Sequence, residues 1–471
     1  MLSHFFLEKI KKNFPHVPTP EQDIALNELS EFIFSQDSES LFLLKGYAGT
    51  GKSSLVGSIV RTMNELEQKS VLLAPTGRAA KVFALYAGQN AYTIHKKIYR
   101  QKTFSNEPTG FLPADNLHKN TLFIVDEASM ISNDGFDSFV FGSGRLLDDL
   151  IHYVYSGEGC RLILLGDSAQ LPPVSQAESP ALDINTLQGY GMNVKSITLT
   201  QIVRQAEMSG ILLNATDLRN ALVNETVNVF PKIITKNCPD IKIISGDELI
   251  DALDESYNRD GMEETIIISR SNKRANIFNN GVRNRILYRE EELSSGDMLM
   301  VAKNNYFWST DEKNIDFIAN GDLMEVLKIR KEQELYGFRF SDLTVRFPDY
   351  NLEMDVKVLM ETLHTDVPGL SKETADKLFY SILEDYEDIS TKQEKMKKMK
   401  VDPFFNAVQI KYAYAVTCHK AQGGQWKNVF LDISYVPEEY LGINFYRWLY
   451  TAFTRATERI FLINPAKELL A

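Results

Sequence analysis

The stretch Gly46–Ser53 reads G-Y-A-G-T-G-K-S and matches the phosphate-binding pattern G-x-x-x-x-G-K-[ST] at every position. An apolar run, Ser40–Lys45, precedes it and a helical stretch follows it, which is the strand-to-helix setting that the pattern requires. Its glycines let backbone amides curl around phosphate oxygens without a Cβ in the way. We therefore predict a P-loop, and a chance glycine-rich turn is the less favoured interpretation.

The P-loop predicts ATP as the substrate and Mg²⁺ as its metal partner. Lys52 is expected to reach the β- and γ-phosphates, and Ser53 is expected to be a ligand of Mg²⁺. The predicted nucleotide-binding residues of the loop are Gly46, Ala48, Gly49, Thr50, Gly51, Lys52, Ser53 and Ser54.

Short apolar runs alternate with helical stretches through the first 200 residues. Each run is almost uniformly apolar, which is typical of central strands in a parallel sheet, because both faces of such strands are covered. Ligands of open α/β sheets sit at the carboxyl ends of the strands, so the chemistry is expected after each run. The runs are Ser40–Lys45, Val71–Ala74, Leu122–Val125 and Leu162–Leu165.

Similar runs near the C-terminus predict a second α/β unit, interrupted between about Ser295 and Ala407. The interruption alternates polar and apolar residues and carries turn signals at Asn320-Gly321 and Pro348–Asn351, which predicts a small antiparallel barrel. A charged run, Glu384–Lys400, favours a solvated helix, with a basic arm on DNA as the alternative. The later runs are Thr265–Ser269, Ala413–Thr417, Val429–Leu431 and Ile460–Ile463.

Composition argues against several classes of protein. No apolar run reaches 18 residues and the N-terminus has no signal-peptide pattern, so we expect no membrane span and a cytoplasmic location. The three cysteines form no C-x-x-C pair, so no zinc site or disulfide framework is indicated. The net charge of −12 argues against a wholly basic DNA-binding surface.

Two further strand ends carry candidate catalytic groups. In V-D-E-A-S, Asp126 is predicted to be the second Mg²⁺ anchor and Glu127 the general base that polarises the attacking water; a capping pair before a helix is the alternative. In G-D-S-A-Q-L-P-P-V, Gln170 is placed to touch the γ-phosphate or the water, unless the segment is a plain turn.

Charge on the transferring phosphoryl group is commonly met by an arginine finger. The candidates are Arg204 in L-T-Q-I-V-R-Q and Arg455 in Y-T-A-F-T-R-A-T. Each could instead form a structural salt bridge. Both lie far from the P-loop in sequence, so they can reach the γ-phosphate only if a second domain closes over the nucleotide.

Eight segments, in this order, resemble the motifs of superfamily 1 DNA helicases, specifically those of the RecD/Pif-like, Dda-like branch. The resemblance covers about residues 15 to 465. The segments are G-Y-A-G-T-G-K-S, A-P-T-G-R-A-A, T-I-H, V-D-E-A-S-M, G-D-S-A-Q-L-P-P-V, L-T-Q-I-V-R-Q, C-H-K-A-Q-G and L-Y-T-A-F-T-R-A.

The resemblance implies an α/β fold with two RecA-like motor domains, each with a parallel sheet, and a small SH3-like barrel inserted in the second. The first domain is expected at residues 1–205, with a pin insertion at about 96–120. The second is expected at 206–294 and 408–471, and the barrel with a helical insertion at 295–407.

Site residues follow from the same resemblance. Gln22 in T-P-E-Q is implied to read the adenine base, although an exposed helix residue would look the same. The implied single-strand contacts are Thr76, Arg78 and His95 from the first domain and Thr417, His419 and Lys420 from the second.

Two places depart from the pattern. Gln425, followed by Trp426, stands where related motors often carry Glu, so a ribose contact by Gln425 is expected with less support. The pin segment does not align, and Phe104 and Phe111 are either wedge residues or packing residues.

The function implied is an ATP-dependent DNA helicase that moves 5′-to-3′ on single-stranded DNA and acts at single-strand/duplex junctions as a monomer. The direction comes from the resemblance alone. The alternatives are a translocase or protein-displacing ATPase with little unwinding, and a non-enzymatic nucleotide-binding module. The acidic total fits a motor that holds few nucleotides through local cations and aromatic stacking.

Overall fold

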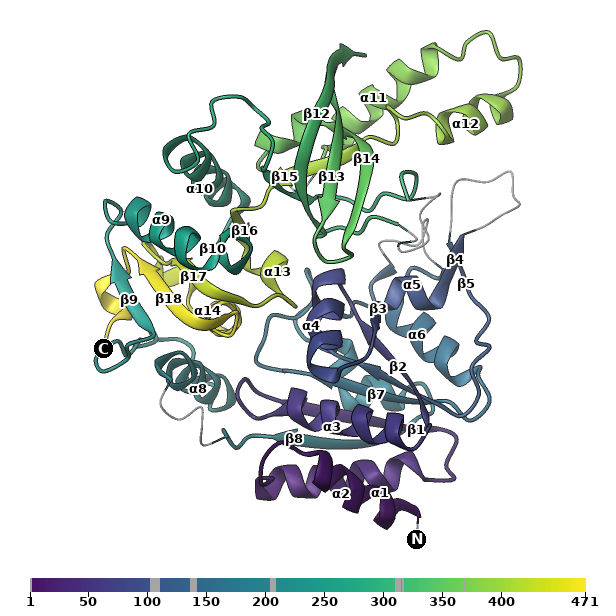
Figure 1. The fold of residues 1–471 in the computed structure, drawn as a ribbon, viewed down its shortest axis with the longest axis vertical. Helices are drawn as coiled ribbons and strands as arrows, with labels where there is room; N and C mark the ends of the chain where they lie inside the picture. The colour runs from purple at the N-terminus through teal and green to yellow at the C-terminus, as the bar shows by residue number, and fades with distance from the viewer. Residues whose placement is uncertain are drawn as a thin grey trace.

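The computed structural model describes residues 2–101, 111–135, 142–203, 209–309, 315, 317–367 and 369–471. Two parallel sheets with helices around them stand beside each other, and a closed barrel lies above the gap between them in the view of Figure 1. The predicted fold class, α/β with two parallel sheets and an inserted small barrel, is confirmed.

The first sheet has six parallel strands in the order β3-β2-β6-β7-β1-β8. Its four inner strands coincide with the predicted apolar runs, because helices cover both faces and two apolar cores enclose the sheet. The strands are β1 (Ser40–Gly46), β2 (Lys69–Ala74), β3 (Ala91–Thr93), β6 (Thr121–Val125), β7 (Arg161–Gly166) and β8 (Asn193–Leu199). The helices are α1 (Leu2–Asn13), α2 (Pro20–Ile33), α3 (Lys52–Glu65), α4 (Gly77–Ala87), α5 (Ile94–Ile98), α6 (Leu146–Tyr155) and α7 (Ile184–Gln188).

The second sheet has five parallel strands in the order β16-β10-β17-β18-β9. The strands are β9 (Ile241–Ile244), β10 (Thr265–Ser269), β16 (Ala415–Thr417), β17 (Trp426–Asp432) and β18 (Ala456–Ile463). The helices are α8 (Gly210–Val223), α9 (Leu249–Asp260), α10 (Asn272–Arg285), α13 (Cys418–Ala421) and α14 (Ile443–Phe453).

The barrel closes through five strands, β11-β12-β13-β14-β15. The two longest form a hairpin whose turn residues Tyr336 and Gly337 have left-handed φ values of 59° and 71°. The fifth strand lies just beyond residue 407, where we expected the insertion to end. The strands are β11 (Met298–Val301), β12 (Leu323–Leu335), β13 (Phe338–Phe347), β14 (Leu352–Leu359) and β15 (Val408–Tyr412); α11 (Lys372–Glu384) and α12 (Lys392–Lys400) separate the last two.

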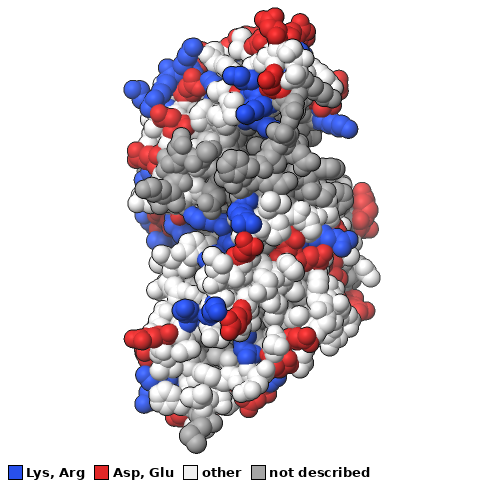
Figure 2. Space-filling view, turned by 90° about the vertical axis from the view of Figure 1, so that its right-hand side faces the viewer, with Lys and Arg blue, Asp and Glu red and all other residues white. Residues whose placement is uncertain are grey.

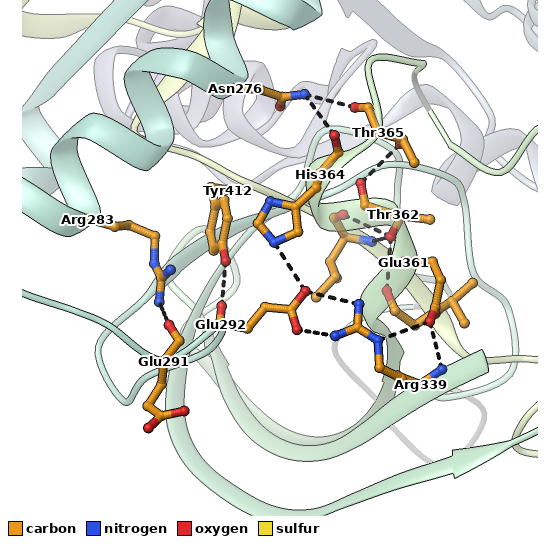
Figure 3. A network of polar contacts seen from close by, with 12 residues as sticks. Asn276, Arg283, Glu291, Glu292, Arg339, Glu361, Thr362, His364, Thr365 and Tyr412 are labelled. Atoms are coloured by element: carbon orange, nitrogen blue, oxygen red, sulfur yellow. Dashed lines mark hydrogen bonds and ion pairs between the residues drawn. The ribbon is translucent and has the colours of Figure 1, made fainter. Parts of the chain in front are cut away.

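The barrel and the second sheet are joined as one body. A single apolar core continues from the second sheet into the barrel, and the buried Asp297 carboxylate beneath it accepts from Arg283 at 3.0 Å and from Arg289 at 2.6 Å. Nearer the surface, Glu292 accepts from Arg339 of β13 and lies 3.1 Å from Nε2 of His364 (Figure 3). Because so many buried and charged contacts cross this junction, we expect the barrel to move with the second sheet.

Candidate functional site

The P-loop joins β1 to α3 at the carboxyl end of the first sheet. Gly49 and Gly51 have φ values of 75° and 82°, so the loop uses the conformational freedom of glycine at both positions. The Lys52 ammonium donates to the carbonyls of Gly46 and, at 3.0 Å, of Tyr47. Lys52 is therefore folded into its own loop, where phosphate oxygens could replace the two carbonyls.

The other predicted loop residues divide into two groups. Ser53 and Ser54 line the cavity above the loop, as do Ala48, Gly49 and Gly51. Thr50 is buried and its hydroxyl donates to the carbonyl of Tyr47 at 2.8 Å, so only its backbone could face a phosphate. Gly46 lies beneath the Lys52 side chain, where an added Cβ would come within 2.9 Å of Cγ.

Asp126 and Glu127 follow β6 at the same sheet edge. Asp126 is enclosed and accepts from its neighbour's amide at 2.8 Å; burial, and then the Glu127 charge, raise the pKa of its carboxyl. Glu127 adopts a left-handed backbone with φ 52° and keeps 22% of its side chain exposed toward the cleft. Strained backbones of this kind cluster at functional sites, where they fix the direction of a side chain.

Gln170 lies beyond β7 and is 8% exposed. Its side-chain oxygen is buried and has no hydrogen-bond partner among the described residues. A buried acceptor without a donor is costly, so a ligand or water is expected to supply one. The neighbouring Asp167 is occupied, because it accepts from the Tyr450 hydroxyl at 2.6 Å.

Arg455 enters the site from the second sheet. It is 3% exposed, and its guanidinium donates to the carbonyls of Thr451 and Gly424 at 3.1 and 3.2 Å. Its Nη1 lies 3.7 Å from Oε1 of Glu127, so a cation of the second unit meets a carboxylate of the first. Arg204, the other finger candidate, lies outside the described residues.

Gln22 is fully engaged in the present arrangement. Its amide oxygen accepts from the Thr19 amide at 3.0 Å, and its nitrogen donates to the Thr50 carbonyl at 2.9 Å. The side chain thus connects the start of α2 to the P-loop. It lines the same cavity as Gln425, so both predicted base and ribose contacts are within one space.

The cavity has a volume of about 710 Å³ and lies between the two sheets, lined by the P-loop, Asp126, Glu127, Gln170 and Arg455. The residues fit a nucleotide with Mg²⁺. The Gln170 side-chain oxygen has no donor among the described residues, and a water beside the phosphates could donate to it. Ser53 and Asp126 supply the oxygen ligands that Mg²⁺ prefers, and the Lys52 ammonium lies beside them. Such a site needs only one or two protein carboxylates, because Mg²⁺ keeps waters and phosphates as its other ligands.

Two residues of this site were given no role from the sequence, although one of them, Tyr450, lies within the segment L-Y-T-A-F-T-R-A. The Tyr450 hydroxyl accepts from the Ala48 amide at 2.9 Å while donating to Asp167, so it bridges the second unit to the P-loop. The Tyr86 hydroxyl of α4 donates to Asp126.

Comparison with known proteins agrees with this geometry. Residues 20–230 match the family described as AAA domain, and residues 412–463 match the UvrD-like helicase C-terminal domain. The ATP-dependent RecD2 DNA helicase of Deinococcus radiodurans is 26% identical over 90% of this chain and 47% of its own length. The ATP-dependent DNA helicase dda of Enterobacteria phage T4 is 24% identical over 64% of this chain and 68% of its own.

In sequence the chain is similar to DNA helicases of the RecD/Pif-like branch of superfamily 1. It spans about half the length of the RecD2 relative. The uncharacterized protein R530 of Acanthamoeba polyphaga mimivirus is 23% identical over 93% of this chain and 98% of its own length.

The strand contacts predicted in the first unit lie at the start of α4 and on α5, and two of them, Arg78 and His95, lie against aromatic side chains of the protein. Thr76 caps α4 by accepting from the Ala79 amide at 3.2 Å. The Arg78 guanidinium lies 4.2 Å from the ring centre of Trp426 and donates to the Gln425 carbonyl at 3.1 Å. The His95 ring lies 6.1 Å from that of Phe317, and burial lowers the pKa of His95 to about 4.

The predicted contacts of the second unit line a groove instead. Thr417, His419 and Lys420 line a cavity of about 480 Å³ between the second sheet and the barrel, together with Lys273 and Lys411. Lys420 donates to the Asn320 side chain of the barrel turn, and burial lowers its pKa to about 8.

Arg270 and His419 also line an adjoining cavity of about 620 Å³ that contains Pro172, Tyr440 and Trp448. Arg270 lies 4.7 Å from the ring centre of Tyr440, which is 57% exposed. Cations and the exposed aromatic face of Tyr440 therefore line the two cavities. On the face drawn in Figure 2, Lys and Arg are interspersed with Asp and Glu and form no continuous basic surface.

Within the segment 96–120, where a pin was expected, residues 102–110 lie outside the described part, Phe104 among them. On either side of them, β4 (Tyr99–Gln101) pairs with β5 (Phe111–Pro113) as an antiparallel two-stranded sheet. In the described ranges, no helix is both long enough and apolar enough to cross a membrane.

Proposed function

We propose that this chain is an ATP-dependent DNA helicase that translocates 5′-to-3′ along single-stranded DNA and unwinds duplex ahead of it. The observation that carries the proposal is the cleft itself. The P-loop, Asp126 and Glu127 of one unit line it together with Arg455 of the other, whose Nη1 lies 3.7 Å from Oε1 of Glu127, so the set of phosphoryl-transfer groups is complete only between the two units.

Each group has a role in hydrolysis. Lys52 would exchange its loop carbonyls for the β- and γ-phosphates, and Glu127 would take a proton from a water held by Gln170. Arg455 would stabilise charge on the transferring phosphoryl group. Mg²⁺, held through Ser53 and Asp126, would neutralise charge on the phosphate oxygens.

The strand track that we propose runs along the two adjoining grooves of the second unit. Phosphates would lie on Lys420, Lys411 and Arg270, and bases would stack on Tyr440, because single strands are bound by local cations and aromatic faces. This arrangement needs no basic surface, so it is compatible with the net charge of −12.

Closure of the cleft would convert hydrolysis into movement. Besides Arg455 and Tyr450, Leu171 also connects the two units across it: its amide donates to Thr451 at 2.9 Å, and its carbonyl accepts from Gln422 at 2.7 Å. Leu171 follows Gln170 in the chain, so a displacement of Gln170 at the γ-phosphate would be transmitted to the second unit through the bonds of Leu171.

The test uses duplexes that carry a single-stranded tail on either the 5′ or the 3′ side. We expect ssDNA-stimulated phosphate release, and strand separation only with the 5′ tail. Separation only with the 3′ tail would overturn the direction. DNA-stimulated ATP hydrolysis without strand separation on either substrate would favour a translocase. A rate of ATP hydrolysis that DNA does not change would exclude a DNA motor.

A further inference from the structure

Helix α4 contacts the second unit, the barrel and the nucleotide cavity. At its start, Arg78 stacks on Trp426 of the second unit, and an added Cβ at Gly77 would collide with the Tyr350 hydroxyl of the barrel. One turn on, the Lys81 ammonium lies 3.3 Å from Oδ1 of Asp349, a barrel carboxylate that is 5% exposed. In Figure 1, α4 lies directly beneath the barrel.

The other end of the same helix reaches the nucleotide site. The Tyr86 hydroxyl donates to Oδ2 of Asp126 and has the Ser53 hydroxyl beside it. It therefore contacts both residues predicted to hold Mg²⁺. The phenol is enclosed and stacked, with the Phe83 ring 5.1 Å away at 27°, so the hydroxyl has a defined direction.

We propose that Tyr86 is a positioning residue for hydrolysis, which sets the orientation of the Asp126 carboxylate according to the position of α4. An α-helix of 11 residues is a stiff rod about 16 Å long, so a displacement at its start reaches Tyr86. The N-terminal end of α4 contacts the second unit and the barrel, so a movement of either would displace it. This inference rests on the proposed function, because it explains how an occupied strand groove would accelerate hydrolysis.

The contact is not required by the fold alone. The Phe83 ring, which is fully buried, already anchors this part of α4 to the core of the first sheet. A phenylalanine at position 86 would fill the same space. What the hydroxyl adds is its bond to Asp126, a polar connection between α4 and the sheet edge where the predicted chemistry takes place.

The test compares Tyr86→Phe with Tyr155→Phe in the full chain. Tyr155 lies on α6 of the same unit and donates to the Ser40 carbonyl at 2.8 Å, away from the cleft, so it controls for loss of a partly buried tyrosine bond. For Tyr86→Phe we expect ssDNA-stimulated kcat to fall about tenfold, the scale of one lost hydrogen bond to a charged group, with KM for ATP little changed. The unstimulated rate should fall less, so the stimulation ratio shrinks.

A second readout does not depend on turnover. Mn²⁺ binding to the complex of protein and ADP, followed by electron paramagnetic resonance, should weaken several-fold in Tyr86→Phe and stay unchanged in Tyr155→Phe. If Tyr86→Phe keeps both the wild-type stimulation ratio and the wild-type Mn²⁺ affinity, the positioning role is wrong. If the wild-type protein itself shows no stimulation by ssDNA, the proposed function fails instead.

A variant at the other end of α4 keeps the inference testable if Tyr86→Phe does not fold. Lys81→Ala removes the contact with Asp349 from a side chain that is 51% exposed and is not part of the lining of the nucleotide cavity. It should lower the stimulation ratio while leaving unstimulated hydrolysis at the wild-type rate. An unchanged ratio would mean that α4 does not carry the signal.

Discussion

Replacing Glu127 by glutamine separates binding of ATP from its hydrolysis. The change keeps the size of the side chain and the left-handed backbone, with φ 52°, but removes the proton acceptor and one negative charge. Losing a general base lowers a rate by about 10²–10⁴-fold. That corresponds to about 3–5 kcal/mol of transition-state stabilisation.

The charge change acts in the opposite direction on binding. The Glu127 carboxylate raises the pKa of Asp126, so its removal makes Asp126 easier to ionise and a better partner for Mg²⁺. Arg455 keeps its bonds to Thr451 and Gly424 and stays in place. We therefore expect Glu127→Gln to bind ATP at least as well as the wild type while kcat falls at least about a hundredfold.

The assay pairs equilibrium binding of a fluorescent ATP analogue with phosphate release at saturating ssDNA. Glu158→Gln is the matched control, because Glu158 makes an exposed ion pair with Lys119 at 2.6 Å, far from the cleft. The control should match the wild type in both measurements. Collapse of ATP affinity, with bound ATP hydrolysed at the normal rate in a single turnover, would refute the assignment of Glu127 as the base.

Three other changes are predicted to have distinct outcomes. Lys52→Ala should abolish hydrolysis with an unchanged melting curve, since Lys52 bonds only to carbonyls of its own loop; normal DNA-stimulated turnover would refute the P-loop role. Arg455→Ala should lower turnover about 10³-fold or more while ATP still binds; wild-type turnover with DNA present would argue for a single-unit ATPase. The pKa of Lys420, about 8, predicts that ssDNA affinity falls between pH 7 and 9 as this cation loses its proton, and that Lys420→Arg, measured by fluorescence anisotropy, removes that part of the decrease.

The inner strands were predictable because burial on both faces leaves a continuous apolar run, as in β1, β6 and β7. Among the edge strands, β16 was predicted within Ala413–Thr417, whereas β3, β8 and β9 were not. Strand β8 has only one fully buried residue of seven, and β9 has exposed residues between its two buried ends, so neither leaves such a run. The barrel hairpins followed from alternation, while β15 was hidden because it continues into the stretch that leads to β16.

The site was predictable where chemistry follows a strand end, as for Asp126 and Gln170. The bridging tyrosines were not. Tyr86 and Asp126 are 40 positions apart, and Ala48 and Tyr450 are 402 apart, so no local pattern reports either bond. Arg78 was expected at the strand groove from the resemblance, but its side chain meets Trp426, the residue beside the one that departs from the family pattern. Its role on DNA stays a prediction.

Because the barrel is fixed to the second sheet, a rotation of that sheet is expected to displace the end of the β12–β13 hairpin. The turn at Tyr336 and Gly337 follows the end of β12, and the arrowhead of β12 lies at the top of the molecule in Figure 1, on the side of the barrel away from the two sheets. The barrel is anchored to the second sheet through the buried Asp297. A small rotation of that sheet would therefore move the hairpin turn farther than it moves residues near the axis of rotation. A dye at position 336, paired with one on the first unit, would therefore register closure of the cleft as a change in the distance between the two dyes.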